Sequence, residues 1–324
     1  MTGFNIAVVG CGKWGMNHVR TAYKLYGERL KYCSDSTSES EKKVKEVSEK
    51  IIFTNEISRI ADDESVSAVI VSTPAETHFE ITKLLLEAGK NVLTEKPITL
   101  NSKEATILND IAEKKGLNLM VGHLLLYHPA ILKIKEYIDT GKLGKLQYIY
   151  SNRLNLGTIR TEENILWSFA PHDISVIQYF TGDIPAEVTA TGAVFLQKNI
   201  QDTTLTVLKF KNNIHAHIYV SWLHPFKEQR LVVIGDKSMM MFEDTLKENK
   251  LKFYPKGFDM VDGHPVKRDL DFQNIEFDSS SPLEEEQKHF IESIENHVTP
   301  RSDGRNAIEV LETLERAQKE LLKD

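Results

Sequence analysis

The chain has 324 residues, enough for two domains that each bury a core of their own. Hydrophobic residues make up 41% and charged residues 27%, which excludes a disordered or fibrous protein. The formal net charge of −7 opposes attraction to phosphate backbones, so we expect no nucleic-acid partner, and an anionic ligand would need a local group of cations.

The two cysteines, Cys11 and Cys33, lie in segments typical of a buried α/β core, where a reduced Cys acts as a small apolar residue. Strand-like residues begin at Phe4, which leaves no room for a signal peptide ahead of the fold. No apolar run approaches the roughly 18 residues of a membrane span. We therefore expect a cytoplasmic protein without membrane contact.

A glycine-rich turn follows the first expected strand. Residues 5–9, NIAVV, form the short apolar run of a parallel strand, and GCGKWG at residues 10–15 then opens a helix that stops at Gly27. A second apolar run, residues 30–33, leads to Asp35, 20 residues beyond Gly15. This order of strand, glycine spacing, helix and acidic residue indicates a dinucleotide-binding turn.

Each of these residues has an expected task. Gly10 makes the tight turn, Gly12 lets a pyrophosphate approach the backbone, and Gly15 allows the helix to pack closely on the strand. The bare amides at the helix start face the phosphates. Asp35 would accept hydrogen bonds from the adenosine ribose and repel a 2′-phosphate, which favours NAD over NADP. The alternative is a glycine-rich turn with a solvated Asp.

The alternation of strands and helices continues beyond this unit. Further strands are expected at residues 67–72, 91–93 and 117–121, and helices at residues 76–88 and 101–115. Each of the two helices is followed by a glycine, and Asn101 and Glu104 have the spacing of a capping box. The pattern predicts an α/β fold with at least five parallel strands in a doubly wound sheet.

Doubly wound sheets bind ligands at the carboxyl ends of their strands, and three polar turns fall at that edge. They are Ser72-Thr73-Pro74, Thr94-Glu95-Lys96-Pro97 and Gly122-His123. Each turn taken singly has the alternative of an ordinary surface loop. Their shared position favours a common site.

Together these segments resemble the family of NAD(P)-dependent sugar dehydrogenases that includes glucose-fructose oxidoreductase, inositol dehydrogenase and a rhizopine-catabolism protein. The resemblance covers essentially the whole chain. Besides the glycine turn, it rests on these residues: Ser72-Thr73-Pro74 with His78, Glu95-Lys96-Pro97, Val121-Gly122-His123 leading to Pro129, His172-Asp173, and RLVVIGD at 230–236.

The resemblance implies a Rossmann domain at residues 1–123 that binds NAD. It implies that residues 124–324 form an α+β domain for substrate binding and oligomerisation, built on an open, largely antiparallel sheet. The candidate cofactor contacts are then Gly10, Gly12, Lys13, Trp14, Gly15, Asp35, Ser72, Thr73, Pro74, His78, Glu95 and Lys96.

Periodicity in the second half agrees with an open sheet. β-rich runs separated by turn residues lie at 146–155, 187–195, 203–210, 214–222 and 231–235. Two amphipathic helices follow, at 282–298 and 307–323, and Ser281-Pro282 is typical of the start of the first.

The resemblance also bears on the substrate. Many family members have Asp four residues before and three residues after the active-site His, where this chain has Ser168 and Ser175. The segments at 152–157, 160–164 and 166–173, with Ser221-Trp222-Leu223, Pro225, Lys227 and Arg230, look like the branch acting on nucleotide sugars. The likeness implies oxidation at C3 of a UDP-2-acetamido sugar, with UDP-N-acetylglucosamine as the leading candidate. The 3-keto product would then serve a partner aminotransferase in lipopolysaccharide biosynthesis.

Oxidation of a secondary alcohol removes a hydride from carbon and a proton from oxygen; the nicotinamide takes the first and the protein supplies a base for the second. His172 and Lys96 are the catalytic candidates, because His and a desolvated Lys reach neutral pKa values without extreme tuning. His172 follows Pro171 in the expected first turn of a helix, whose dipole would lower the imidazole pKa. Lys96, held by Pro97, would stabilise the developing alkoxide; the reverse assignment of the base stays open, as does a helix-cap role for His172.

A UDP-sugar also needs cations and polar contacts. Arg153 and Arg160 lead the candidates for the diphosphate, ahead of Lys227 and Arg230, although each has the alternative of a surface salt bridge. Asn155 is expected to bond sugar hydroxyls. The candidate substrate contacts are completed by His123, Tyr127, Trp167 and His172, with core packing as the alternative for the aromatic residues.

Other functions stay open: a dehydrogenase of a free sugar, an inositol or a UDP-sugar uronic acid, an NAD-dependent glycosidase that oxidises C3 transiently, and a non-catalytic cofactor-binding sensor. No metal is expected, because the sequence has neither zinc-type Cys spacing nor an H-E-x-x-H pair. An open sheet with an uncovered apolar face predicts a homo-oligomer, a dimer or tetramer.

Overall fold

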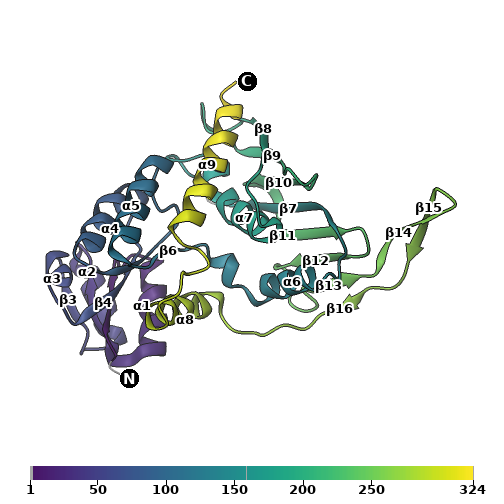
Figure 1. Cartoon of the computed structure of the whole chain (residues 1–324). Helices are drawn as coiled ribbons and strands as arrows, with labels where there is room; N and C mark the ends of the chain where they lie inside the picture. The colour runs from purple at the N-terminus through teal and green to yellow at the C-terminus, as the bar shows by residue number, and fades with distance from the viewer. Residues whose placement is uncertain (1–2, 158, 324) are drawn as a thin grey trace. The chain divides into compact units, whose positions relative to one another are not determined.

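The computed structural model describes residues 3–157 and 159–323, which fold into two compact units (Figure 1). The first unit comprises Met1–Tyr127 and Ser280–Leu311, and the second comprises His128–Ser279 and Glu312–Asp324. The expected domain boundary at residue 123 thus lies close to the end of the first segment. Residues 280–311 pack with the first unit rather than the second, because α8 (Pro282–Glu295) lies against α1 (Gly15–Tyr26) and η3 (Leu124–Tyr127). The division into a cofactor and a substrate domain stays a prediction.

The first unit is built on a six-stranded parallel sheet with the order β3-β2-β1-β4-β5-β6. Its strands are β1 (Asn5–Val9), β2 (Leu30–Ser34), β3 (Ile52–Thr54), β4 (Val66–Val71), β5 (Asn91–Thr94) and β6 (Leu119–Val121). This is the strand order of a doubly wound dinucleotide-binding sheet, so the predicted fold class is confirmed.

Helices and short 3-10 turns connect these strands. Besides α1, α8 and η3 they are η1 (Gly27–Arg29), α2 (Ser38–Val47), α3 (Ser58–Ala61), η2 (Ala75–Thr77), α4 (His78–Glu87) and α5 (Ser102–Lys115). Asn101 caps α5 by accepting the amide of Glu104 at 3.0 Å, and Gly116 ends it in the left-handed conformation with φ +64°.

The second unit contains an eight-stranded sheet with the order β16-β13-β12-β11-β7-β10-β9-β8. Its strands are β7 (Leu146–Leu156), β8 (Glu187–Ala193), β9 (Thr203–Lys209), β10 (His215–Ser221), β11 (Leu223–Gly235), β12 (Met239–Glu243), β13 (Leu251–Tyr254) and β16 (Gln273–Asn274). All neighbours pair antiparallel except β7 and β10, which run parallel. The expectation of an open, largely antiparallel sheet is therefore confirmed.

Helix α7 (Ile165–Thr181) packs on β7, β9 and β10, and α6 (Pro129–Asp139) contacts α7. Strands β14 (Lys256–Val261) and β15 (His264–Asp269) form a separate two-stranded ribbon. Helix α9 (Gly304–Leu321) begins among the residues of the first unit and ends among those of the second. None of the helices in the described part of the chain is long and apolar enough to span a bilayer.

Candidate functional site

The glycine-rich turn joins β1 to α1, and its three glycines meet different surroundings. Gly10 has φ +90°, and a Cβ there would lie 2.6 Å from the backbone of Ser72 and Thr73. A Cβ on Gly15 would lie 1.9 Å from the carbonyl oxygen of Gly10, so close packing requires both glycines. A Cβ on Gly12 would meet no atom within 4 Å. The open space beside Gly12 is where a ligand can approach the backbone.

Asp35 lies just beyond β2 and is hydrogen-bonded to the same turn. Its Oδ2 accepts the amide of Cys11 at 2.7 Å, and its Oδ1 accepts the amide and hydroxyl of Thr37 at 3.0 and 3.1 Å. Partial burial raises the pKa of Asp35, but the hydrogen bonds from Cys11 and Thr37 outweigh it and lower the pKa overall. Asp35 is therefore an ionised acceptor next to the glycine turn.

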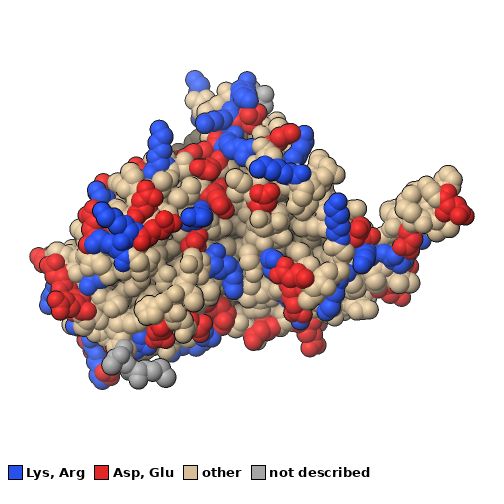
Figure 2. Space-filling view, viewed as in Figure 1, with Lys and Arg blue, Asp and Glu red and all other residues tan. Residues whose placement is uncertain are grey.

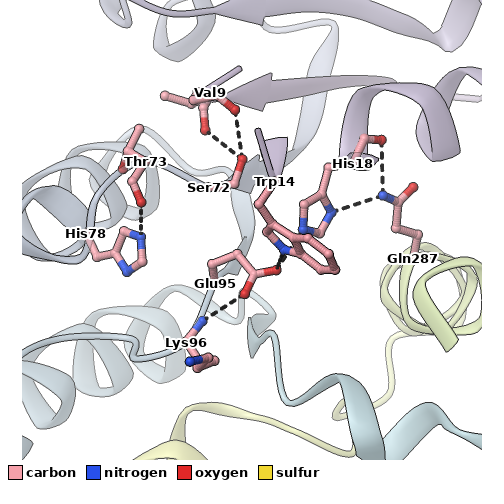
Figure 3. Close-up of polar contacts among 10 residues, drawn as sticks. Val9, Trp14, His18, Ser72, Thr73, His78, Glu95, Lys96 and Gln287 are labelled. Carbon is pink, nitrogen blue, oxygen red and sulfur yellow. Dashed lines mark hydrogen bonds and ion pairs between the residues drawn. The ribbon is translucent and has the colours of Figure 1, made fainter. Parts of the chain in front are cut away.

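The turn after β4 is hydrogen-bonded to the turns after β1 and β5 (Figure 3). The hydroxyl of Ser72 donates to the carbonyl of Gly10 at 2.8 Å. The buried ring of His78 lies between two carbonyl oxygens, that of Thr73 at 2.8 Å from Nε2 and that of Pro97 at 2.7 Å from Nδ1. His78 thus links the turns after β4 and β5, and its direct contact with a cofactor stays a prediction.

Glu95, directly after β5, receives three hydrogen bonds. Its Oε1 is 2.5 Å from the indole Nε1 of Trp14 and 2.7 Å from Nε2 of His18, and its Oε2 accepts the amide of Lys96 at 3.2 Å. Burial raises the pKa of Glu95, but the contacts with His18 and Trp14 and the charge of Lys96 outweigh it and lower the pKa. A Cβ on Gly122 would lie 2.9 Å from Oε2, so this carboxylate also needs a glycine beside it.

Lys96 is half-buried and precedes a cis peptide bond to Pro97. Its charge acts on His123, because burial first and the Lys96 cation second lower the pKa of His123 to about 4. His123 is 2% exposed, and neither ring nitrogen has a hydrogen-bond partner within the described residues. A neutral imidazole with unsatisfied nitrogens beside a cation is suited to bind a polar ligand group.

These features fit a bound dinucleotide. The space beside Gly12 admits phosphates, Asp35 is an ionised ribose acceptor, and the unsatisfied His123 lies near the Lys96 charge. When bound, NAD would supply the hydride acceptor. Lys13 and Trp14 are exposed between the glycines, and Pro74 is exposed in the neighbouring turn, so all three are accessible to it.

Tyr127 has a packed environment. Its side chain is 1% exposed, its hydroxyl lies 2.8 Å from that of Ser302, and the guanidinium of Arg301 lies 5.0 Å from its ring centre. Burial raises the pKa of Tyr127 far above its usual value. This position favours the alternative of core packing, and a substrate contact by Tyr127 stays a prediction.

In the second unit, the expectation that His172 lies in the first turn of a helix is wrong. Helix α7 begins at Ile165, where Asn164 accepts the amide of Trp167 at 3.2 Å, and Pro171 lies inside the helix. His172 is therefore about two turns from the helix start. Because the dipole acts mainly within the first turn, it gives no reason for a lowered pKa here. The half-buried His172 stays a candidate base through its position beside the Asp173 ion pair.

Arg153 on β7 forms a two-pronged ion pair with Asp173 on α7. The distances are 2.9 Å from Nε to Oδ2 and 3.0 Å from Nη2 to Oδ1, and the hydroxyl of Ser151 donates to Oδ1 at 2.6 Å. Asp173 is 3% exposed. Burial alone would lower the pKa of Arg153, but Asp173 outweighs it and raises the pKa. The pair fastens α7 to the sheet, and a phosphate contact by Arg153 stays a prediction.

The remaining substrate candidates are spread over the second unit. Arg160 is exposed and lies 3.4 Å from Glu162, while Asn155 is half-buried near the end of β7. The indole N–H of Trp167 donates to Gln318 of α9 at 3.0 Å. Arg230 is bound to Glu243 at 2.9 Å, whereas Lys227 is exposed. Arg160 also lies 3.9 Å from the half-buried Glu163, so its two ion-pair partners are neighbours in the sequence.

Sequence reasoning missed the residues that lie behind Glu95. His18 of α1 contacts Glu95 directly, and Glu286 and Gln287 of α8 are fully buried in the same part of the first unit. No local motif marks them, because they come from segments far apart in the sequence. Only the packing of α8 on α1 brings them together.

Comparison with known proteins adds to this geometry. A family described as "Oxidoreductase family, NAD-binding Rossmann fold" matches residues 4–123. The GFO/IDH/MocA C-terminal domain matches residues 131–241. Two successive segments of the chain therefore match the NAD-binding domain and the C-terminal domain of one family.

Two individual relatives with different substrates are similar to this chain. UDP-N-acetylglucosamine 3-dehydrogenase of Acidithiobacillus ferrooxidans is 27% identical over 242 residues, which cover 74% of each chain. Inositol 2-dehydrogenase 2 of Saccharopolyspora erythraea is 27% identical over 225 residues, covering 67% of this chain and 66% of the relative. The two relatives have equal identity and different substrates, so identity alone does not assign the substrate.

A solved structure of the A. ferrooxidans enzyme superposes with a TM-score of 0.85 at 23% identity, covering 98% of this chain and 97% of that one. The likeness extends over both compact units and shows a common fold. Together, the glycine turn, the polar turns at the strand ends and the two family matches lead to one conclusion. The chain belongs to the GFO/IDH/MocA oxidoreductases, as an NAD-dependent sugar dehydrogenase whose cofactor domain is a Rossmann fold.

Proposed function

We propose that this chain oxidises the C3 hydroxyl of a UDP-2-acetamido sugar, with NAD as the hydride acceptor. UDP-N-acetylglucosamine is the leading candidate for the substrate. The observation that carries the proposal is the likeness to UDP-N-acetylglucosamine 3-dehydrogenase over 74% of both sequences. Ser168 and Ser175 support it, since they lie on α7 about one turn before and after His172, where many family members have Asp. A dehydrogenase of free inositols or sugars is the second candidate, favoured by the inositol dehydrogenase of equal identity.

In this proposal, the protein's own residues orient the substrate and move one proton. His172 accepts the proton of the 3-hydroxyl, and the Lys96 ammonium stabilises the developing alkoxide. His123 is kept neutral by burial and by Lys96, so it serves as a hydrogen-bonding group rather than a second cation. The reverse assignment, with Lys96 as the base, predicts that the pH profile of kcat follows a lysine instead of a histidine.

Recognition of the UDP group requires cations at one place on a chain of negative net charge. The face visible in Figure 2 carries basic and acidic side chains interspersed with one another, so on this face attraction of an anion would come from individual residues. Arg160 is the leading candidate, because Arg153 is already engaged by the buried Asp173. Arg160→Ala should raise KM for the UDP-sugar and leave the affinity for NAD unchanged.

The matched control is Lys209→Ala, which removes another exposed cation of the second unit, on β9. It should leave both KM values unchanged. Equal loss of NAD affinity in Arg160→Ala would place this residue at the cofactor or in a structural salt bridge.

We also propose a homo-oligomer, with the uncovered face of the eight-stranded sheet as the contact. Side chains alternate along the strands, so the half-exposed row His217, Tyr150, Val232 and Met241 faces away from the buried Ile149 and Val233. A face with this apolar and aromatic content is suited to a second copy. Light scattering should give a dimer or tetramer, and Tyr150→Glu should shift it toward the monomer.

The product of the proposed reaction is a 3-keto UDP-sugar, which a downstream aminotransferase would consume. The decisive experiment incubates the protein with NAD and a panel of UDP-sugars, UDP-sugar uronic acids, free sugars and inositols, and follows NADH absorbance. Accumulation of NADH with UDP-N-acetylglucosamine, and not with N-acetylglucosamine or inositol, would support the proposal. Faster turnover of a free polyol would contradict it, cleavage without net NADH would identify a glycosidase, and no turnover at all would identify a sensor.

A further inference from the structure

A buried polar cluster lies behind Glu95 in the first unit. It consists of His18 of α1, Glu95 after β5 and Glu286 of α8, whose imidazole nitrogen and carboxylate oxygens all lie within 4.8 Å of one another. His18 and Glu286 are both 0% exposed. Both carboxyl oxygens of Glu286 are buried without a hydrogen-bond partner in the described part of the chain. A carboxylate in such a place needs an explanation, because burying an unpaired charge is very costly.

Gln287, the next residue of α8, reveals where the proton of His18 lies (Figure 3). The amide nitrogen of Gln287 is 3.2 Å from the carbonyl oxygen of His18 and 3.1 Å from its Nδ1. A carbonyl oxygen only accepts, so this side of the amide is the NH2 group. Nδ1 of His18 therefore accepts a hydrogen bond from Gln287, and Nε2 carries the proton that is donated to Glu95.

The same residue types also ligate metal ions, but this arrangement suits a proton better. Nε2 of His18 and Oε1 of Glu95 are 2.7 Å apart, the length of a direct hydrogen bond. A nitrogen that donates its proton in this way has no lone pair to offer a cation. The contact between His18 and Glu95 is therefore a hydrogen bond rather than shared ligation of a metal ion.

The two carboxyl groups differ in their number of donors. Glu95 receives Trp14, His18 and the amide of Lys96, whereas Glu286 receives none within the described residues. Burial first and the charge of Glu95 second raise the pKa of Glu286 well above its usual value, while the pKa of Glu95 is lowered. A negative charge on Glu95 is stabilised by its three donors, and a neutral Glu286 avoids a buried charge without a donor.

Other titratable groups lie around Glu286. His18 faces it from α1 and Glu95 from the end of β5, and the charge of Lys96 acts on Glu95. Tyr127 of η3 packs near α8 with the Arg301 cation over its ring, and burial raises the pKa of Tyr127, so its hydroxyl is neutral. None of these groups donates a hydrogen bond to Glu286.

We propose that Glu286 is a positioning residue of the cofactor site, a neutral carboxylic acid whose proton is the fourth donor to Glu95. A gap of at most 4.8 Å is closed by a small side-chain rotation or by one intervening water. The added hydrogen bond holds Glu95 against Trp14 and the amide of Lys96, and so fixes the turn that carries the catalytic lysine. This inference rests on the proposed role of Lys96 and Glu95 beside the nicotinamide, and it does not depend on which sugar is oxidised.

The protonation state is tested first, through stability. The folded state raises the pKa of Glu286 above its unfolded value, so folding with a neutral Glu286 is favoured at low pH and weakens as pH rises toward the native pKa. Glu286→Gln keeps the shape and removes the titration. The ratio of its folding equilibrium constant to that of the wild type should grow about tenfold per pH unit above about pH 5 in urea denaturation. Glu292→Gln, an exposed site on the same helix, is the control and should show no such growth.

The positioning role is tested second, through the affinities for NAD and NADH without any sugar. Tryptophan fluorescence, to which Trp14 contributes, reports binding. Glu286→Gln supplies an N–H donor and should bind both nucleotides within about twofold of the wild type, whereas Glu286→Leu lacks a donor and should bind both about tenfold more weakly. A similar loss for NAD and NADH indicates positioning, because a purely electrostatic effect would act on the charged nicotinamide of NAD and not on NADH.

Two results would overturn the proposal. A stability ratio of Glu286→Gln to wild type that stays constant with pH would show that Glu286 is ionised in the folded chain. Wild-type nucleotide affinity in Glu286→Leu would show that the acid does not position Glu95. Neither measurement uses the sugar substrate, so a failed sugar assay leaves both results interpretable.

Discussion

The glycine-rich turn of the first unit and helix α7 of the second unit show how differently two parts of this chain follow from sequence. In the turn, Gly10 and Gly15 stand where a side chain would collide with backbone, and Gly12 borders open space, as predicted. In α7, the same kind of local reasoning placed His172 at a helix start, yet Asn164 caps the helix about two turns earlier. Backbone geometry is a local property, whereas the role of Pro171 and His172 depends on where the helix begins.

The partners of the two regions explain the difference. The glycine positions of the turn are set by backbone atoms of neighbouring segments, which any doubly wound sheet supplies, and Asp35 and Ser72 add side-chain hydrogen bonds. The contacts of α7 are made by individual side chains, above all the ion pair between Asp173 and Arg153 of β7. The following changes test this contrast between backbone-determined and partner-determined residues.

The largest effect is expected from breaking the ion pair between Arg153 and Asp173. Arg153→Ala leaves the buried Asp173 without its cation and should lower the free energy of unfolding by about 3–5 kcal/mol. Urea denaturation followed by circular dichroism measures it. In Arg153→Lys the charge remains without the two-pronged geometry, so the loss should be smaller. A stable Arg153→Ala protein with a raised KM for the UDP-sugar would instead make Arg153 a phosphate contact.

Lys96→Met should lower kcat about 100-fold or more, the size of effect seen when an oxyanion donor is lost. Steady-state kinetics with saturating NAD measures it, with Lys103→Met, an exposed lysine of the same unit, as the control. The change also removes a cation that lowers the pKa of His123, so NMR titration should find that pKa above its present value of about 4. Near wild-type kcat would make Lys96 a structural residue.

Alanine substitutions at Gly15 and Gly12 should affect folding and cofactor binding separately. Gly15→Ala forces a Cβ against the carbonyl of Gly10 and should destabilise the chain by about 1–3 kcal/mol. Gly12→Ala meets nothing within 4 Å in the chain, so it should fold normally and lose NAD affinity by about tenfold or more. Thermal denaturation and NAD titration of both variants test the pair. Normal NAD binding by Gly12→Ala would show that the phosphates pass elsewhere.

The smallest effect is expected at Asp35. Asp35→Ala removes both the ribose acceptor and the charge that repels a 2′-phosphate, so the preference for NAD over NADP in kcat/KM should narrow by about tenfold. Asp35→Asn removes the charge alone and should have part of this effect. Because its pKa is lowered, the charge of Asp35 is lost only when pH falls through the native pKa, so the preference should be constant around neutral pH. An unchanged ratio in Asp35→Ala would assign the selection to another residue.

The parallel sheet of the first unit and the glycine-rich turn could be predicted from the sequence alone. Strands β1, β4 and β5 were recognisable as continuous apolar runs because parallel strands are covered on both faces. The ends of helix α5 were marked by its capping residues, Asn101 at the start and Gly116 at the end. The five β-rich runs of the second half were also found, although residues 231–235 proved to be only the last part of β11.

Which side chains meet, and which of them are charged, depends on tertiary packing and could not be predicted from the sequence. The parallel pairing of β7 with β10, the pairing of Arg153 with Asp173, and the place of Glu286 behind Glu95 all join segments that are distant in the sequence. No periodicity or cap encodes such a meeting. Burial then sets the pKa values, so Glu95 and Glu286 have opposite pKa shifts although they are the same residue type. Backbone conformation depends mainly on residues that are close in the sequence, whereas the pKa of a side chain depends on all the groups that surround it in the fold.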